Sequence, residues 1–143
     1  MDLFEAACQG VGLAVAAGMV AGAPGKRDGI GYLMLALAAI GAAIFFGASL
    51  ASEDHPAWPG WPVGALIAAG TFYVIADFAA GAAQRAEGGD VIAVAIVVAA
   101  LAVAGLSLLF GPVGLVALAG IVYLWLGRRR RAATKYEGLR TLR

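Results

Sequence analysis

Residues 91–127 read VIAVAIVVAALAVAGLSLLFGPVGLVALAGIVYLWLG, thirty-seven positions without a charged side chain, and Arg128–Arg131 follow directly. The hydrocarbon core of a bilayer is about 30 Å thick, and a helix needs about 20 apolar residues to cross it. The stretch is therefore long enough for nearly two crossings. Near its middle, Gly111-Pro112 breaks the helix, because glycine permits a tight turn and proline lacks an N–H. We expect two transmembrane helices here, at 90–110 and 112–128.

The rest of the chain has the same apolar character. Of its 143 residues, 62% are hydrophobic and 13% are charged, whereas soluble proteins carry about 25% charged residues. Three further charge-poor stretches predict spans at 4–24, 29–51 and 62–85. The sequence therefore predicts an all-α fold, a polytopic integral membrane helix bundle of about five transmembrane helices over residues 1–127. A basic cytoplasmic tail, residues 128–143, follows it.

The placement of charge predicts the orientation, because lysine and arginine concentrate in short cytoplasmic loops. With five spans, Lys26, Arg27, Arg85 and the tail share one side, which then holds all ten basic residues. The opposite side carries acidic residues and the single histidine, and an even number of spans would break this separation. We therefore expect the N-terminus outside, the C-terminus in the cytoplasm and a multi-pass protein of the bacterial inner (plasma) membrane.

Aromatic and basic residues flank the expected spans. Trp58 and Trp61 lie in the proline-rich segment 55–62, whose three prolines argue against a regular helix, and Trp125 lies beside the arginine run. Tryptophan prefers the headgroup level of a membrane, so these three residues are candidate interface anchors. The basic residues are candidates for setting topology or contacting lipid headgroups: Lys26, Arg27, Arg128, Arg129, Arg130 and Arg131. The tail could lie on the inner leaflet as an amphipathic helix or remain solvated.

Asp77 is the main candidate for function, because a carboxylate within a span costs several kcal/mol unless it is protonated, hydrated or paired. Tyr73 and Gln84 lie on the same helical face as Asp77, as do Gly70 and Gly81, and we expect this stripe to face the bundle interior or a subunit interface. Gln9 is a second polar candidate, on the first span. Alternatively, Asp77 has a purely structural role, accepting a hydrogen bond from Tyr73 or Thr71 or pairing with Arg85.

Other chemistries have little support in the sequence. Ser49, Ser52 and Ser107 have no buried histidine or lysine partner for nucleophilic catalysis, and we expect no enzyme activity. His55 stands beside Glu53 and Asp54 in an outer loop, which is weak grounds for a metal site. We expect no metal and no cofactor. The net charge of +1 gives no reason to expect a nucleic-acid partner.

Two segments carry a resemblance to a known family. The pattern from Gly47 to Asp54 and then Ala57-Trp58-Pro59-Gly60, together with the Phe110-Gly111-Pro112 turn that leads to the arginines and Lys135–Arg140, resembles small actinobacterial-type polytopic membrane proteins. That family is described only as a domain of unknown function (DUF4126-like). The resemblance implies an all-helical protein of the bacterial inner membrane and no activity, substrate or catalytic residue.

Two functions remain open at this point. The first is a small transporter- or channel-like protein for an ion or small solute, with Asp77 on the pathway, and such a small bundle favours a homo-oligomer. The alternative is a structural or accessory protein that binds a membrane-protein partner or anionic lipid. Glycine pairs such as Gly18 and Gly22 predict close helix packing in the lipid bilayer under either hypothesis.

Overall fold

The computed structural model describes residues 3–85 and 88–140, with side chains as far as residue 132. These residues form five α-helices: α1 (Leu3–Gly22), α2 (Gly29–Ala51), α3 (Gly60–Ala83), α4 (Gly89–Leu109) and α5 (Pro112–Arg140). Each is long and apolar enough to cross a membrane, with Pro112–Ala132 as the apolar part of α5. The prediction of an all-helical chain with five such helices is confirmed for the described residues, and these helices suggest a multi-pass membrane protein.

The helix bounds follow the expected spans closely, with differences at α3 and α5. Helix α3 begins at Gly60, so Pro62 lies inside its first turn, within the segment where we expected no regular helix. Proline is tolerated there because the first amides of a helix have no partner inside it. Helix α5 does not end near Arg128 but continues to Arg140, about 43 Å in all at 1.5 Å per residue. Arginine is a good helix former, so the arginine run does not stop the helix.

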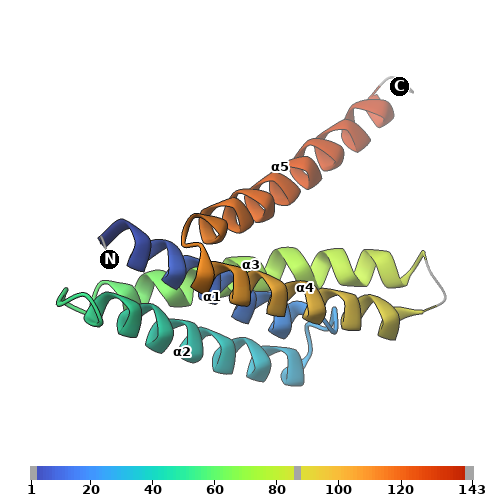
Figure 1. Ribbon diagram of the computed structural model, residues 1–143. Helices are drawn as coiled ribbons and strands as arrows, with labels where there is room; N and C mark the ends of the chain where they lie inside the picture. The colour runs from blue at the N-terminus through green and yellow to red at the C-terminus, as the bar shows by residue number, and fades with distance from the viewer. Residues whose placement is uncertain (1–2, 86–87, 141–143) are drawn as a thin grey trace.

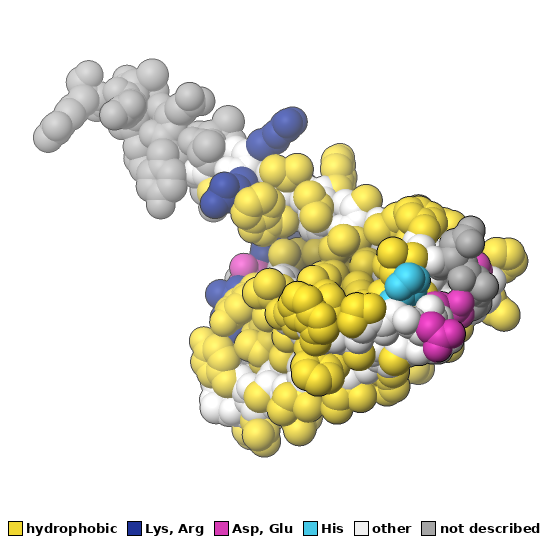
Figure 2. All heavy atoms as spheres, turned by 90° about the vertical axis from the view of Figure 1, so that its left-hand side faces the viewer, with side chains coloured by type: hydrophobic (Ala, Val, Ile, Leu, Met, Phe, Trp, Pro, Cys, Tyr) yellow, Lys and Arg dark blue, Asp and Glu magenta, His cyan; other side chains and the backbone are white. Residues whose placement is uncertain are grey.

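Successive helices run in opposite directions, so α1, α3 and α5 all begin at the same end of the bundle (Figure 1). We call this the first end; it holds the α2–α3 and α4–α5 connections. Acidic side chains and the single histidine gather there, beside a surface that is otherwise mostly hydrophobic (Figure 2). The opposite end, the second end, holds the α1–α2 connection with Lys26 and Arg27, and the end of α3 with Arg85. Lysine and arginine are therefore absent from the first end among the described residues, whereas the second end holds basic residues together with Asp28 and Asp90.

Helix α1 is the centre of the bundle. Among the described residues it packs against all four other helices, whereas α2 contacts only α1 and α3. Its glycines explain this position, because small residues let helix backbones approach closely. Gly10 lies against the Phe46 side chain of α2, and a Cβ atom added at Gly22 would lie 2.9 Å from the Phe72 carbonyl oxygen of α3. The expected close packing at Gly18 and Gly22 occurs within the chain, against α3.

A second close contact joins α1 to α4 and α5 near the first end. The side chain of Ser107, on α4, is fully buried and donates a hydrogen bond to the Val103 carbonyl oxygen at 2.7 Å. It fills the space where a side chain at Gly12 would stand, and a Cβ atom there would also lie 3.1 Å from the Cα atom of Gly114 on α5. We call this the Gly12–Gly114 contact.

Beyond this contact, α5 leaves the bundle. Ile121 is the last buried side chain along α5 among those described, and the helix points away from the others toward its C-terminal end (Figure 1). Two apolar grooves open beside it. One of about 400 Å³ lies between α3 and α5, and one of about 610 Å³ lies between α4 and α5, with α1 and α3 as its floor.

Candidate functional site

Asp77 lies near the second end of α3 and pairs with two arginines from separate parts of the chain. Its Oδ1 atom is 2.5 Å from Nη2 of Arg27, in the α1–α2 connection, and its Oδ2 atom is 3.3 Å from Nη1 of Arg128, on α5. Arg128 also donates from Nη2 to the backbone carbonyl oxygen of Asp77 at 2.8 Å. We call this group the Arg27–Asp77–Arg128 cluster. It ties the part of α5 that leaves the bundle back to α3.

Aromatic rings extend the cluster on both sides. Arg27 donates from Nη2 to the Tyr73 carbonyl oxygen at 3.2 Å, and its guanidinium carbon lies 5.2 Å from the centre of the Tyr73 ring. On α5, the guanidinium carbon of Arg129 lies 4.3 Å from the centre of the Trp125 ring. Such cation–π contacts contribute about 0.5–1 kcal/mol at exposed sites. These contacts position Arg27 beside Tyr73 of α3 and Arg129 beside Trp125 of α5.

The α1–α2 connection is shaped to deliver Arg27 to α3. Gly25 has φ +66°, a left-handed conformation that favours glycine, and a Cβ atom there would lie 2.9 Å from the backbone nitrogen of Ala80. The turn therefore sits directly on α3. Asp28 then caps α2, accepting a hydrogen bond from the Gly31 amide at 2.9 Å, as N-cap aspartates do. Arg27 is held between these two fixed points.

Charge does not balance within the cluster. The Asp77 side chain is 46% exposed, and those of Arg27 and Arg128 are each 42% exposed, so all three are accessible from outside the protein. Two guanidinium groups face one carboxylate, which leaves an excess of one positive charge. The second end of the bundle is therefore cationic around Asp77, and an anion is the ligand that this charge attracts.

The predicted stripe around Asp77 does not face the bundle interior, so that part of the expectation is wrong. Gly70, Tyr73 and Gln84 are exposed and Gly81 is half-buried, whereas the buried face of α3 carries Thr71, Phe72 and Ile75. The interior face of α3 is the one that the glycines of α1 contact. The other expected location, a subunit interface, stays a prediction.

The sequence suggested Arg85 or Thr71 as structural partners of Asp77, and both suggestions are wrong. Its partners are Arg27 and Arg128, not Arg85, which lies eight residues further along α3, about 12 Å of helix rise away. Thr71 is not a donor either: its buried Oγ1 atom has no hydrogen-bond partner within the described part of the chain. The sequence missed both true partners. The same-side distribution of Lys26, Arg27 and the α5 arginines was the available clue.

The remaining predicted residues lie apart from the cluster. Gln9 is in the first half of α1, thirteen residues and about 20 Å of helix rise from Gly22, so it belongs to the first end. Gln84 follows the last residue of α3. Trp58 and Trp61 are exposed at the first end and Trp125 is exposed toward the second. In residues 3–85 and 88–132, no three histidine, cysteine, aspartate or glutamate side chains gather as a metal site would require.

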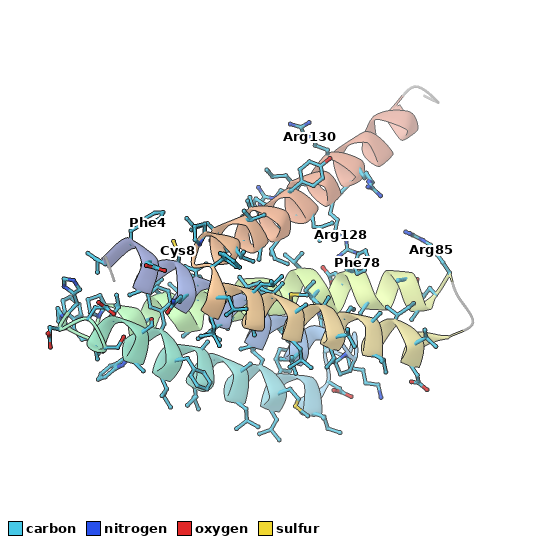
Figure 3. The ribbon with its side chains drawn as sticks, in the orientation of Figure 1. Phe4, Cys8, Phe78, Arg85, Arg128 and Arg130 are labelled. Atoms are coloured by element: carbon cyan, nitrogen blue, oxygen red, sulfur yellow. The ribbon has the colours of Figure 1, made fainter. Side chains whose placement is uncertain are left out.

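A small pocket adjoins the cluster on the far side of Arg128. It has a volume of about 160 Å³ and lies between the end of α3 and α5. Three arginines line it, Arg85, Arg128 and Arg131, and no acidic side chain does among those that the structure describes. We call it the basic pocket. Figure 3 shows Arg85, Phe78 and Arg128 on the side of α3 that faces α5.

Comparisons of the chain with protein-family models, with curated proteins and with solved structures find no match. The resemblance to the family described only as a domain of unknown function therefore stays a prediction.

Proposed function

We propose that this chain is a non-enzymatic protein of the bacterial inner membrane that binds anionic phospholipid at its cytoplasmic end. The observation that carries the proposal is the Arg27–Asp77–Arg128 cluster, in which two guanidinium groups share one carboxylate. Arg85, Arg129 and Arg131 line the two pockets beside it. Arginine suits phosphate because its planar fork of N–H donors matches two phosphate oxygens at once.

The orientation that we propose places the second end of the bundle in the cytoplasm and the first end outside. It rests on the positive-inside rule, since the second end holds Lys26, Arg27 and Arg85. The cytoplasmic leaflet carries the anionic lipids, and each basic group near its surface contributes about 1 kcal/mol of attraction. In this orientation the cationic end meets the anionic surface.

The experiment compares lipids that share acyl chains and differ in headgroup charge. The thermal stability of the full-length protein in a neutral detergent is measured with dioleoylphosphatidylglycerol and with dioleoylphosphatidylcholine. We expect the anionic lipid to raise the melting temperature more, and we expect the difference to shrink in 0.5 M salt, because salt screens exposed charges. Equal stabilisation by the two lipids would refute the proposal.

The transporter-like hypothesis is the second proposal, and one observation favours it: Asp77 and its two arginines form a half-exposed polar group on otherwise apolar helices. The excess positive charge favours an anionic solute over a cation. Flux of small anions into proteoliposomes should then fall in Asp77→Asn, with Arg129→Gln as a control that leaves the carboxylate in place. Unchanged flux in Asp77→Asn removes this residue from any pathway.

A homo-oligomer also stays a proposal. Gly41 on α2 and Gly105 on α4 face open space, so each offers a notch where the backbone of a second copy could approach. The mass of the protein in detergent, from light scattering, tests this directly, and a monomer at all concentrations would exclude it.

A further inference from the structure

The basic pocket adjoins the larger apolar groove, because Phe78, Tyr123 and Leu124 line both. The pocket lies at the second end and contributes three arginines. The groove runs from there toward the first end, between α4 and α5. A cationic pocket beside an apolar groove is chemically complementary to the headgroup and the acyl chain of an anionic phospholipid.

The length of the groove matches one leaflet of a bilayer. On α4 it extends from Ile92 to Val103, eleven residues and about 16 Å at 1.5 Å per residue. Half of a hydrocarbon core of about 30 Å is about 15 Å. The groove therefore spans the depth that one acyl chain occupies, beginning at the level of the arginines.

Small residues keep the groove open. Ala95 and Ala99 line it on α4, and Ala117 and Gly120 line it on α5. A Cβ atom added at Gly120 would have no neighbour within 4 Å. The small side chains at these four positions leave room for a groove of about 610 Å³.

Arg128 and Arg131 lie three residues apart on α5 and so on one face of the helix, and Arg85 approaches the pocket from the end of α3. Gly81 and Gly127 form part of the pocket wall, and neither has a side chain that would block a ligand. The arrangement offers guanidinium groups from two helices to a single phosphate. Charge-assisted hydrogen bonds of this kind are about twice as strong as neutral ones.

We propose that one anionic phospholipid of the cytoplasmic leaflet binds between α3, α4 and α5, with its phosphate in the basic pocket and one acyl chain in the apolar groove. This inference rests on the proposed function, and it adds a single defined site and a stoichiometry of one. Charge complementarity at the basic pocket favours an anionic lipid over a second copy of the chain as the occupant of the groove.

The test is native mass spectrometry of the full-length protein with dioleoylphosphatidylglycerol. We expect wild type to retain one lipid. Arg85→Gln should weaken retention at least about tenfold, because the phosphate would lose a charged hydrogen-bond donor. Gly120→Leu should weaken it similarly by filling the groove, and Ala99→Leu repeats the test from the opposite wall. Ala36→Leu is the matched control, because Ala36 is also exposed but lies on α2, which does not line the groove.

Each further outcome has a defined meaning. If the anionic lipid stabilises wild type but all variants retain it equally, this site is overturned while the proposed function stands. If the anionic lipid neither stabilises wild type nor is retained by it, both the proposed function and this site are overturned. Competition by inorganic phosphate together with unchanged retention in Gly120→Leu would identify a free-phosphate site and overturn the lipid. A change of oligomeric mass in Gly120→Leu would identify the groove as a subunit interface, which also overturns the proposal.

Discussion

Replacing Gly114 with alanine tests the contact that attaches α5 to the bundle. A Cβ atom there would lie 2.7 Å from the Gly12 nitrogen and 3.0 Å from the Gly12 Cα atom, and closer still to the Cys8 carbonyl oxygen. Non-bonded carbon atoms prefer separations of about 3.5–4.0 Å. The backbones of α1 and α5 would therefore have to separate by about 1 Å, which would also loosen Ser107 against Gly12.

The matched control lies six residues further along the same helix. Gly120→Ala adds the same methyl group where no atom lies within 4 Å. Both substitutions gain the intrinsic helix preference of alanine over glycine, which is about 1 kcal/mol or less. That gain cancels in the comparison, and overpacking costs about 1–3 kcal/mol. Gly114→Ala should therefore be less stable than Gly120→Ala by about 1–3 kcal/mol.

The assay is reversible unfolding in mixed micelles of increasing sodium dodecyl sulfate content, followed by tryptophan fluorescence. Trp125 lies on α5, and it reports the release of this helix when Trp58 and Trp61 are replaced by phenylalanine in both variants. The free energy of unfolding is compared at a common detergent composition to avoid a long extrapolation. If the two variants agree within about 0.5 kcal/mol, the Gly12–Gly114 contact does not hold α5 as the structure implies.

Three further predictions follow from the fold. Thr71→Val should leave the free energy of unfolding unchanged or raise it by up to about 1 kcal/mol, since the buried Thr71 hydroxyl has no hydrogen-bond partner among the described residues and burial of such a group costs about 1–3 kcal/mol. A clear loss of stability in the same micelle titration would show that the hydroxyl is bonded. Asp77→Asn should change stability by less than about 1 kcal/mol, because half-exposed ion pairs contribute little. Asp77→Asn should nevertheless broaden the distribution of distances between spin labels at positions 83 and 132, measured by double electron–electron resonance in a Cys8→Ser background. Arg129→Gln, the control, should leave the distribution unchanged. An unchanged distribution in Asp77→Asn would argue that the Arg27–Asp77–Arg128 cluster does not tie α5 to α3. Reporter fusions at the two ends of the chain should be active in opposite compartments, and activity in the same compartment would contradict five crossings.

The sequence was sufficient to predict the helices but not their arrangement. Charge-free length predicted five helices, and the predicted bounds of α2 agree with Gly29–Ala51. The central position of α1 was not predicted, because in lipid the exposed and buried faces of a helix are equally apolar. Its glycines were the clue: Gly10, Gly12, Gly18 and Gly22 contact helices on three different sides. A helix with glycines on several faces can be approached closely from several sides, and this favours a central position in the bundle.

The candidate site was also predicted only in part from the sequence. A lone carboxylate within a span was enough to single out Asp77, since its burial cost is a matter of residue type and depth. Its partners depend on tertiary distances, and Arg27 and Arg128 are fifty and fifty-one residues from it in sequence. The outward direction of the stripe was missed for a related reason. Periodicity groups Tyr73 and Asp77 on one face, but only the packing of α1 against α3 decides which face is inside.

The way α5 is mounted makes it a lever arm. Its fulcrum is the Gly12–Gly114 contact, and from Gly114 to Arg128 the helix rises about 21 Å, and from Gly114 to Arg140 about 39 Å. A pivot that moves Arg128 by 1 Å therefore displaces the far end of α5 by nearly 2 Å. Any change in the ion pair between Asp77 and Arg128 that moves Arg128 therefore produces a larger displacement at the C-terminal end of α5.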